Sequence, residues 1–202
     1  MPSDSKQPKM TTLEEGKLKF IFDDSWSEVL HYDTFEDVKK SHLSCVDFVG
    51  VRSDKDVFLF EIKDFKNRPP EQHDSMVSKL LPDSQSTHDN KVSPLLKEIV
   101  GNVKDSLLFL SLHSRKKILK ETEIWLSMRG KIEGQTNQIH VVLWLELDKG
   151  YPNLSAREVL SAQNILESKL QQRLSWLTPN VVVTDAQRHP FGDSIKIERA
   201  KK

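Results

Sequence analysis

Three residues of the chain have the types and spacing needed to bind a divalent cation and to assist hydrolysis. Glu61 and Lys63 flank Ile62 near the end of an apolar segment, and Asp47 lies 14 residues before Glu61. Carboxylates are hard oxygen ligands for Mg2+, and a bound cation lowers the pKa of a coordinated water and polarises a phosphoryl oxygen. A lysine beside them could orient that water or stabilise developing charge. With the backbone carbonyl of Ile62, the trio predicts a Mg2+ or Mn2+ site suited to phosphodiester hydrolysis.

The two segments that carry these residues are predicted to form a β-hairpin. Residues 45–51 and 57–63 are rich in β-branched and aromatic side chains, and a short polar stretch separates them. Antiparallel pairing then sets Asp47 opposite Glu61, and alternation along the strand puts Lys63 on the same face. Carboxylates directly opposite each other repel, so a cation or Lys63 must neutralise the pair.

An Asp on one strand followed by Glu-x-Lys on the next resembles the PD-(D/E)xK nuclease superfamily, with Asp47, Glu61 and Lys63 at the matching positions. Roughly residues 17–198 are also similar to a largely uncharacterised bacterial group within or near that superfamily. The resemblance implies an α/β (α+β) fold of the restriction-endonuclease-like kind, with a mixed β-sheet flanked by helices. It also implies a metal-dependent nuclease that acts on DNA or RNA. The stretches that carry the similarity to the group are residues 45–49, 59–65, 142–146 and 170–177.

The segment before Asp47 departs from the superfamily pattern. The superfamily usually places a strand between its first helix and the Asp-bearing strand, whereas residues 26–43 here are helical in pattern. Within them, Asp33 is predicted to be a helix N-cap with Glu36 at the third helical position. We therefore expect a capping role for Glu36 and assign no metal ligand to this segment.

The rest of the chain predicts one α/β domain over residues 13–202, preceded by a disordered tail over residues 1–12. Ser93 and Pro94 form a helix start signal. The expected helices are residues 94–112, packed over the sheet, residues 121–132, and residues 156–177. The expected strands outside the hairpin are residues 17–22, a strand buried on both faces at residues 139–147, and residues 181–183 and 194–197.

Residues 66–92 form a long polar stretch directly after the trio, predicted to be either a substrate-facing loop or a mobile surface insertion. Basic residues here and beyond could contact the phosphates of a nucleic acid. For those in the helix and after it, a solvated helix face or a favourable helix-end charge is an equal or better explanation. The candidate contacts are Lys66, Arg68, Lys104, Arg115, Lys116 and Lys117.

Composition bounds the function further. The net charge is zero, which argues against strong nonspecific binding to DNA. The single cysteine, Cys45, fits a reducing compartment and is predicted to be a packed thiol. Neither a membrane-spanning run nor a secretory h-region is present, so a cytoplasmic protein without a membrane partner is expected. A homodimer or another protein partner stays open.

Aromatic residues offer a further test of the predicted core. Trp144 and Trp176 lie on apolar stripes and are expected to be buried, as is Trp125, whereas Trp26 lies in a polar context and is expected to be exposed. The histidines have no zinc-site spacing and the glycines form no phosphate-binding loop, so these chemistries lack support.

Two functional hypotheses follow. In the first, the protein is a Mg2+-dependent nuclease in which Asp47 and Glu61 bind the cation and Lys63 orients water or stabilises charge. In the second, it is a catalytically inactive nuclease-fold module for protein or nucleic-acid interaction, in which Lys63 pairs with the two carboxylates in a salt-bridge cluster.

Overall fold

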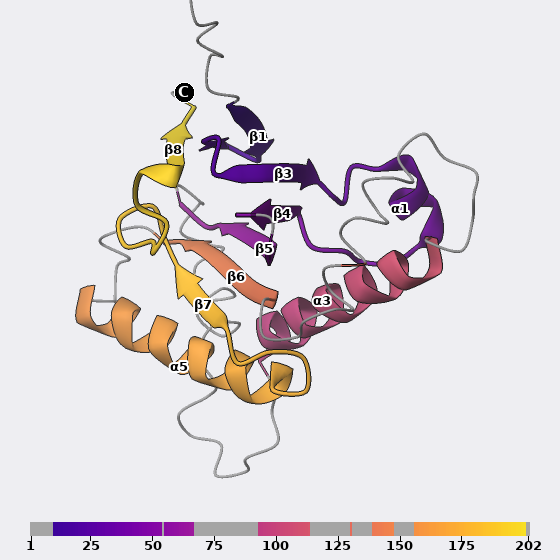
Figure 1. Ribbon diagram of the computed structural model, residues 1–202. Coiled ribbons are helices and arrows are strands. Elements are labelled where there is room, and N and C mark those ends of the chain that lie inside the picture. Colours follow the sequence, from indigo (N-terminus) through magenta and orange to yellow (C-terminus); the bar gives the residue numbers. More distant parts are fainter. Residues whose placement is uncertain are drawn as a thin grey trace, which may run out of the picture.

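The computed structural model describes residues 10–53, 55–66, 93–113, 130, 139–147 and 156–200 (Figure 1). The strands are β1 (Thr11–Glu15), β2 (Leu18–Phe22), β3 (Trp26–His31), β4 (Phe48–Arg52), β5 (Asp56–Asp64), β6 (Ile139–Glu146), β7 (Val181–Thr184) and β8 (Ile195–Arg199). The helices are α1 (Glu36–Ser41), α3 (Pro94–His113), α5 (Ala156–Leu174) and the short 3-10 helix η3 (Gly192–Ser194). These elements make a mixed α/β protein of the α+β class.

The larger sheet has five strands in the order β3-β4-β5-β6-β7. Strands β3, β4 and β5 are antiparallel neighbours, and β5, β6 and β7 are parallel, so the prediction of a mixed sheet is confirmed. In the β4–β5 hairpin Val49 pairs with Leu59 and Val51 pairs with Val57. This is the register that the sequence predicts.

Helices α3 and α5 cover one face of this sheet (Figure 1). Side chains such as Val49 and Leu59 from the hairpin pack there against Ile99 of α3, and all three are fully buried. Since side chains alternate along β5, Glu61 and Lys63 lie on the same face as Leu59. The helix-covered face of the sheet is therefore the one that carries the predicted trio.

The other face packs against a second sheet with the strand order β1-β2-β8. The layer between the sheets is aromatic: Phe20 of β2 makes edge contacts with Phe48 and Trp144, with ring centroids 5.3 and 5.2 Å apart. Such pairs add to the free energy that the buried area itself provides. Strand β6 is buried along nearly its whole length between the two layers, as predicted.

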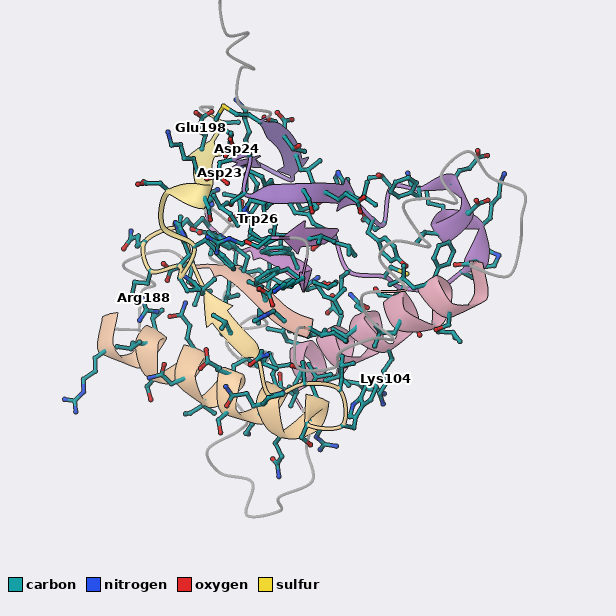
Figure 2. The ribbon with its side chains drawn as sticks, in the orientation of Figure 1. Asp23, Asp24, Trp26, Lys104, Arg188 and Glu198 are labelled. Atoms are coloured by element: carbon teal, nitrogen blue, oxygen red, sulfur yellow. The ribbon has the colours of Figure 1, made fainter. Side chains whose placement is uncertain are left out.

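Trp26, labelled in Figure 2, belongs to this aromatic layer, so the prediction that it is exposed is wrong. Only 4% of its surface is accessible. Trp26 lies in β3 and faces Gly50 of β4, where an added Cβ would come within 3.0 Å of the indole ring. The missing side chain at residue 50 makes the room that the indole fills.

The prediction of a helical segment over residues 26–43 is also wrong in its first part, since Trp26–His31 is the strand β3. Helix α1 is short, and Phe35 rather than Asp33 occupies its N-cap position. Glu36 makes an exposed ion pair with Lys40 at 2.7 Å instead of a capping contact. Strand β3 precedes α1, and among the described residues α1 leads to β4 without an intervening strand, so the departure from the superfamily order remains.

The remaining predictions fare unevenly. Helix α3 begins at Pro94 and β6, β7 and β8 lie where strands are expected, whereas Thr11 and Thr12 belong to β1 rather than to a tail. Residues 1–9, 67–92, 114–129, 131–138 and 148–155 lie outside the described residues, and with them most of the predicted loop, the helix predicted over residues 121–132 and Trp125. In the described part of the chain, none of the helices is long and apolar enough to cross a membrane.

Candidate metal-binding and catalytic site

The predicted trio comes together at one end of the hairpin. Asp47 lies one residue before β4, and Glu61 and Lys63 lie in the last part of β5. Lys63 Nζ is 2.7 Å from Glu61 Oε1. Asp47 lies close enough to Glu61 for the charge of one to alter the pKa of the other.

Asp47 continues the hairpin with its side chain. Its Oδ2 accepts a hydrogen bond from the backbone N–H of Ile62 at 2.6 Å, beyond the last backbone pair of β4 and β5, which joins Phe48 to Phe60. The N–H and C=O groups of one strand residue point to the same neighbouring strand. The carbonyl of Ile62 therefore faces the side on which Asp47 lies, which fits its predicted use as a ligand.

Glu61 is the most deeply buried member, with 1% of its surface accessible. Its Oε1 accepts a hydrogen bond from Asn102 Nδ2 at 3.0 Å and also contacts Lys63. Its Oε2 is buried and has no hydrogen-bond partner among the described residues. An unpaired buried oxygen of a charged group is costly, so this atom is where a ligand would gain most.

Lys63 is held between two carboxylates. Besides Glu61, its Nζ contacts Glu98 Oε1 of α3 at 2.8 Å. Burial lowers the pKa of Lys63, but attraction to Glu61 and hydrogen bonds to both carboxylates outweigh it, so the pKa is raised overall. The ammonium group therefore stays protonated.

Burial, and after it the charge of Glu61, raises the pKa of Asp47 from 3.8 to about 8. Burial also raises the pKa of Glu61, although Lys63 and Asn102 oppose that shift. Two buried carboxylates that repel each other hold a proton near neutral pH unless a cation replaces it. A divalent ion would take the place of that proton.

Helix α3 contacts Glu61 and the backbone before Asp47 through a polar stripe that was not predicted from the sequence. Besides the contact of Asn102 with Glu61, the hydroxyl of Ser106 accepts the backbone N–H of Val46 at 2.9 Å, directly before Asp47. The neighbouring Asp105 accepts the N–H of Ser44 at 3.1 Å. The members Glu98, Asn102, Asp105 and Ser106 are spaced 4, 3 and 1 residues apart and so share one helix face. Polar residues at this spacing, on or beside the apolar face of a helix, were the sequence signal from which the stripe could have been predicted.

Cys45 lies beside this stripe and is buried, as predicted. Burial raises the pKa of its thiol to about 11, although a hydrogen bond with Ser106 opposes the shift. A thiol with a raised pKa is a weak nucleophile at neutral pH. Cys45 is therefore interpreted as a packed core residue and not as a nucleophile.

The two candidate phosphate contacts in the described part of the chain, Lys66 and Lys104, do not contact the trio. Lys66 pairs with the buried Glu146, which also accepts the indole N–H of Trp144 at 2.9 Å. Close by, Arg199 of β8 makes two hydrogen bonds to Asp64, at 2.7 and 2.9 Å. Asp64 and Trp144 face the aromatic layer, so this cluster lies on the face of the sheet opposite to Glu61 and Lys63.

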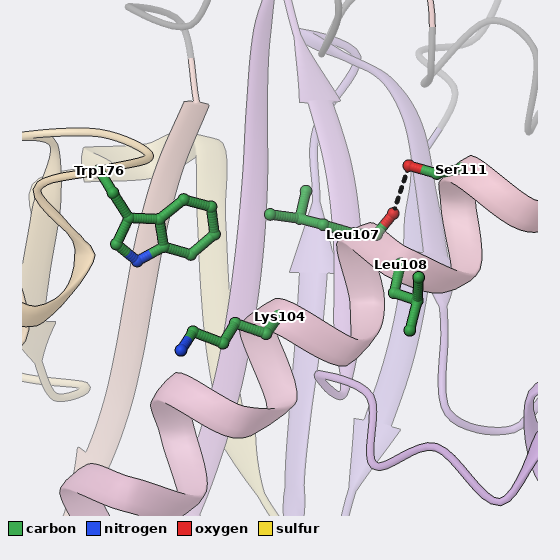
Figure 3. A pocket seen from close by; sticks show the side chains of 5 residues that line it. All are labelled: Lys104, Leu107, Leu108, Ser111 and Trp176. Atoms are coloured by element: carbon green, nitrogen blue, oxygen red, sulfur yellow. Dashed lines mark hydrogen bonds between the residues drawn. The ribbon is translucent and has the colours of Figure 1, made fainter.

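Lys104 points away from the site. It lines a surface pocket of α3 with Leu107, Leu108, Ser111 and Trp176 (Figure 3). Trp176 is 56% exposed, so the prediction that it is a core residue is wrong, whereas Trp144 is fully buried as expected. Arg68, Arg115, Lys116 and Lys117 lie outside the described residues.

A second cluster of ligand-type side chains lies near the trio. His31 Nε2 is 3.2 Å from both Glu15 Oε2 and Asp33 Oδ1, and the three atoms lie within 4.8 Å of one another. The charge of Glu15 contributes to the raised pKa of Asp47. A divalent ion and a protonated histidine between two carboxylates suit this geometry equally well. Glu15 ends β1, His31 ends β3 and Asp33 follows β3, so no local spacing in the sequence joins Glu15 to the others.

We found no family model, no curated protein and no solved structure that matches the chain. The functional interpretation therefore depends on the geometry of the site.

Proposed function

We propose that the protein is a metal-dependent phosphodiesterase, a nuclease that hydrolyses DNA or RNA. The observation that carries this proposal is the buried Oε2 of Glu61, which has no hydrogen-bond partner among the described residues and belongs to a carboxylate pair with Asp47. A bound cation would satisfy that oxygen, for which the described residues supply no donor, and would remove the repulsion between the two charges.

Asp47, Glu61 and the carbonyl of Ile62 would hold Mg2+ or Mn2+. When bound, the ion would acidify a coordinated water and polarise the phosphoryl oxygen. The ammonium of Lys63, kept protonated beside Glu61, would stabilise the charge that develops on the phosphoryl group or orient the attacking water. Asp47 is anchored through Ile62 and Glu61 through Asn102, so the ligands need little rearrangement.

The arrangement of elements supports the restriction-endonuclease-like fold that the resemblance implies. Strands β3, β4 and β5 form an antiparallel meander, helix α3 follows, and β6 returns parallel to β5. Asp47 lies at the start of the second strand of the meander, and Glu61 and Lys63 lie at the end of the third. Strand β3 belongs to this meander although the short helix α1 lies between it and β4 in the chain.

Calorimetric titration with Mn2+, combined with cleavage assays on DNA and RNA, tests the proposal. We expect the unaltered protein to bind Mn2+ and to cleave at least one nucleic acid only when Mg2+ or Mn2+ is present. The double variant Asp47→Asn, Glu61→Gln should lose both properties, because neutral amides are poor ligands for a hard cation. The control is Glu15→Gln, which alters the neighbouring cluster and should leave both intact. Mn2+ binding that survives the double variant and disappears in Glu15→Gln would contradict the assignment.

A second candidate function is the catalytically inactive nuclease-fold module. The observation that favours it is the engagement of Lys63 by both Glu61 and Glu98, which leaves a closed salt-bridge cluster. The zero net charge of the chain points the same way.

Fluorescence anisotropy with labelled DNA and RNA in EDTA separates the two functions. The module predicts binding that is equal in the unaltered protein and in the double variant Asp47→Asn, Glu61→Gln, with no cleavage after Mg2+ is added. Cleavage on addition of Mg2+ by the unaltered protein alone would exclude the inactive module.

A further inference from the structure

The side-chain amide of Asn102 reaches Glu61 from the polar stripe of α3. Asn102 is almost completely buried, with 9% of its surface accessible, and its Nδ2 donates to Glu61 Oε1 at 3.0 Å. The same oxygen contacts Lys63 Nζ at 2.7 Å. Two donors therefore converge on one oxygen of the carboxylate.

The other oxygen, Oε2, is left without a hydrogen-bond partner among the described residues. This distribution is unusual for a buried charge, because a carboxylate can accept at both oxygens and gains by doing so. The terminal torsion of a glutamate has a broad, roughly two-fold preference, so the side chain itself does not select an oxygen. The donors, Asn102 and Lys63, must therefore determine which oxygen of Glu61 is left without a partner.

Lys63 alone does little to determine which oxygen of Glu61 is hydrogen-bonded. Its ammonium is a point charge on a flexible stem and is shared with Glu98 at 2.8 Å. The amide of Asn102 is more restricted, since it is buried and projects from a helix whose next turn is fixed by the hydrogen bond that the N–H of Val46 donates to Ser106. Of the two donors, Asn102 is the one with a fixed direction.

We propose that Asn102 is a positioning residue of the metal site: its amide holds Glu61 Oε1 so that Oε2 faces the cation. The inference rests on the proposed function. Partners that orient a ligand typically change metal affinity by about 10- to 100-fold when removed. Asn102 touches neither the ion nor the substrate in this account, and it acts only through Glu61.

Asn102→Leu tests the proposal because leucine keeps much of the volume of the side chain and removes the donor. Gln163→Leu is the matched control, since Gln163 of α5 is also a buried amide, 2% accessible, that donates to a carboxylate, Asp185, at 3.2 Å. Both variants lose a hydrogen bond from a buried side-chain amide to a carboxylate. Only the first lies at the site.

We expect Asn102→Leu to weaken Mn2+ binding by about 10- to 100-fold in calorimetry, and Gln163→Leu to leave it unchanged. Cleavage by Asn102→Leu should recover when Mn2+ is raised to saturation, and circular dichroism should show that the variant is already folded before Mn2+ is added. Should Asn102→Leu fail to fold, Asn102→Ala is compared with Gln163→Ala in the same way.

Two results would overturn the inference, and only the second would also overturn the proposed function. Unaltered Mn2+ affinity in the Asn102 variant, with normal binding by the unaltered protein, shows that Asn102 does not position the ligand and leaves the proposed function standing. Failure of the unaltered protein to bind Mn2+ removes the proposed function and the positioning role together.

Discussion

Replacing Asp47 with asparagine should abolish Mg2+-dependent cleavage and, in the absence of metal, raise the free energy of unfolding at pH 8.5. Cleavage should fall by at least about 100-fold, because a cation ligand is lost. Stability should rise by about 1–3 kcal/mol, because an ionised carboxylate no longer has to be buried beside Glu61. Asparagine keeps an oxygen that can accept the N–H of Ile62, so the bond that closes the hairpin is retained.

The stabilisation by Asp47→Asn should depend on pH in a defined direction. The pKa of Asp47 is raised from 3.8 to about 8, so between these values the metal-free folded protein holds more protons than the unfolded chain. Its free energy of unfolding must then fall as pH rises through this window. The advantage of the variant should accordingly be absent near pH 4 and complete above pH 8.

Urea denaturation in EDTA at pH 5 and pH 8.5 measures this change. Asp64→Asn is the control, since Asp64 lies at the end of β5 in the same hairpin but is paired with Arg199. That variant should lose stability at both values of pH. Equal destabilisation by the two substitutions at pH 8.5 would mean that Asp47 serves as an ordinary structural carboxylate.

Removal of the Lys63 ammonium should have the second large effect. Lys63→Met keeps the aliphatic stem and deprives Glu61 of its cation, which leaves a buried carboxylate with Asn102 as its donor. Loss of one partner from a buried ion pair should cost about 2–4 kcal/mol of folding stability in urea denaturation. Cleavage should fall by about 100- to 10,000-fold, since the group that stabilises developing charge is gone.

A double substitution separates the two roles of Lys63. Lys63→Met, Glu61→Gln removes both charges and should recover most of the stability while cleavage stays absent. The exposed pair of Lys40 and Glu36 supplies a control, and Lys40→Met should leave both quantities unchanged. A Lys63→Met protein as active as the original would remove Lys63 from the proposed chemistry.

The hairpin was predictable from sequence because its determinants are local. Alternation of apolar residues and a short polar turn are enough to pair Val49 with Leu59 and to set Glu61 and Lys63 on the face beneath α3. The start of α3 was predictable for the same reason, since Ser93 and Pro94 are adjacent in the chain. The same alternation along the first strand of the hairpin puts Asp47 on the face that carries Glu61 and Lys63.

Features that depend on distant partners were missed. Trp26 has polar neighbours in the chain, and its burial depends on Gly50, a residue of another strand that leaves room for the indole. The strand β3 was mistaken for a helix because its strand conformation depends on pairing with β4, on the other side of α1, which its own residue pattern does not show. Asn102 reads as an ordinary polar helix position until the sheet places Glu61 beneath it.

The polar stripe of α3 also links the site to the folding of the whole domain. Asn102 holds Glu61 of β5, and Ser106 holds the backbone of Val46 directly before Asp47, so undocking of this one helix would release the Glu61 carboxylate and the segment that leads into Asp47. The hairpin by itself would therefore be an incomplete host for a cation. If the ion binds as proposed, its binding energy adds directly to the equilibrium between docked and undocked α3, and loss of the ion would loosen the helix as well as the ligands.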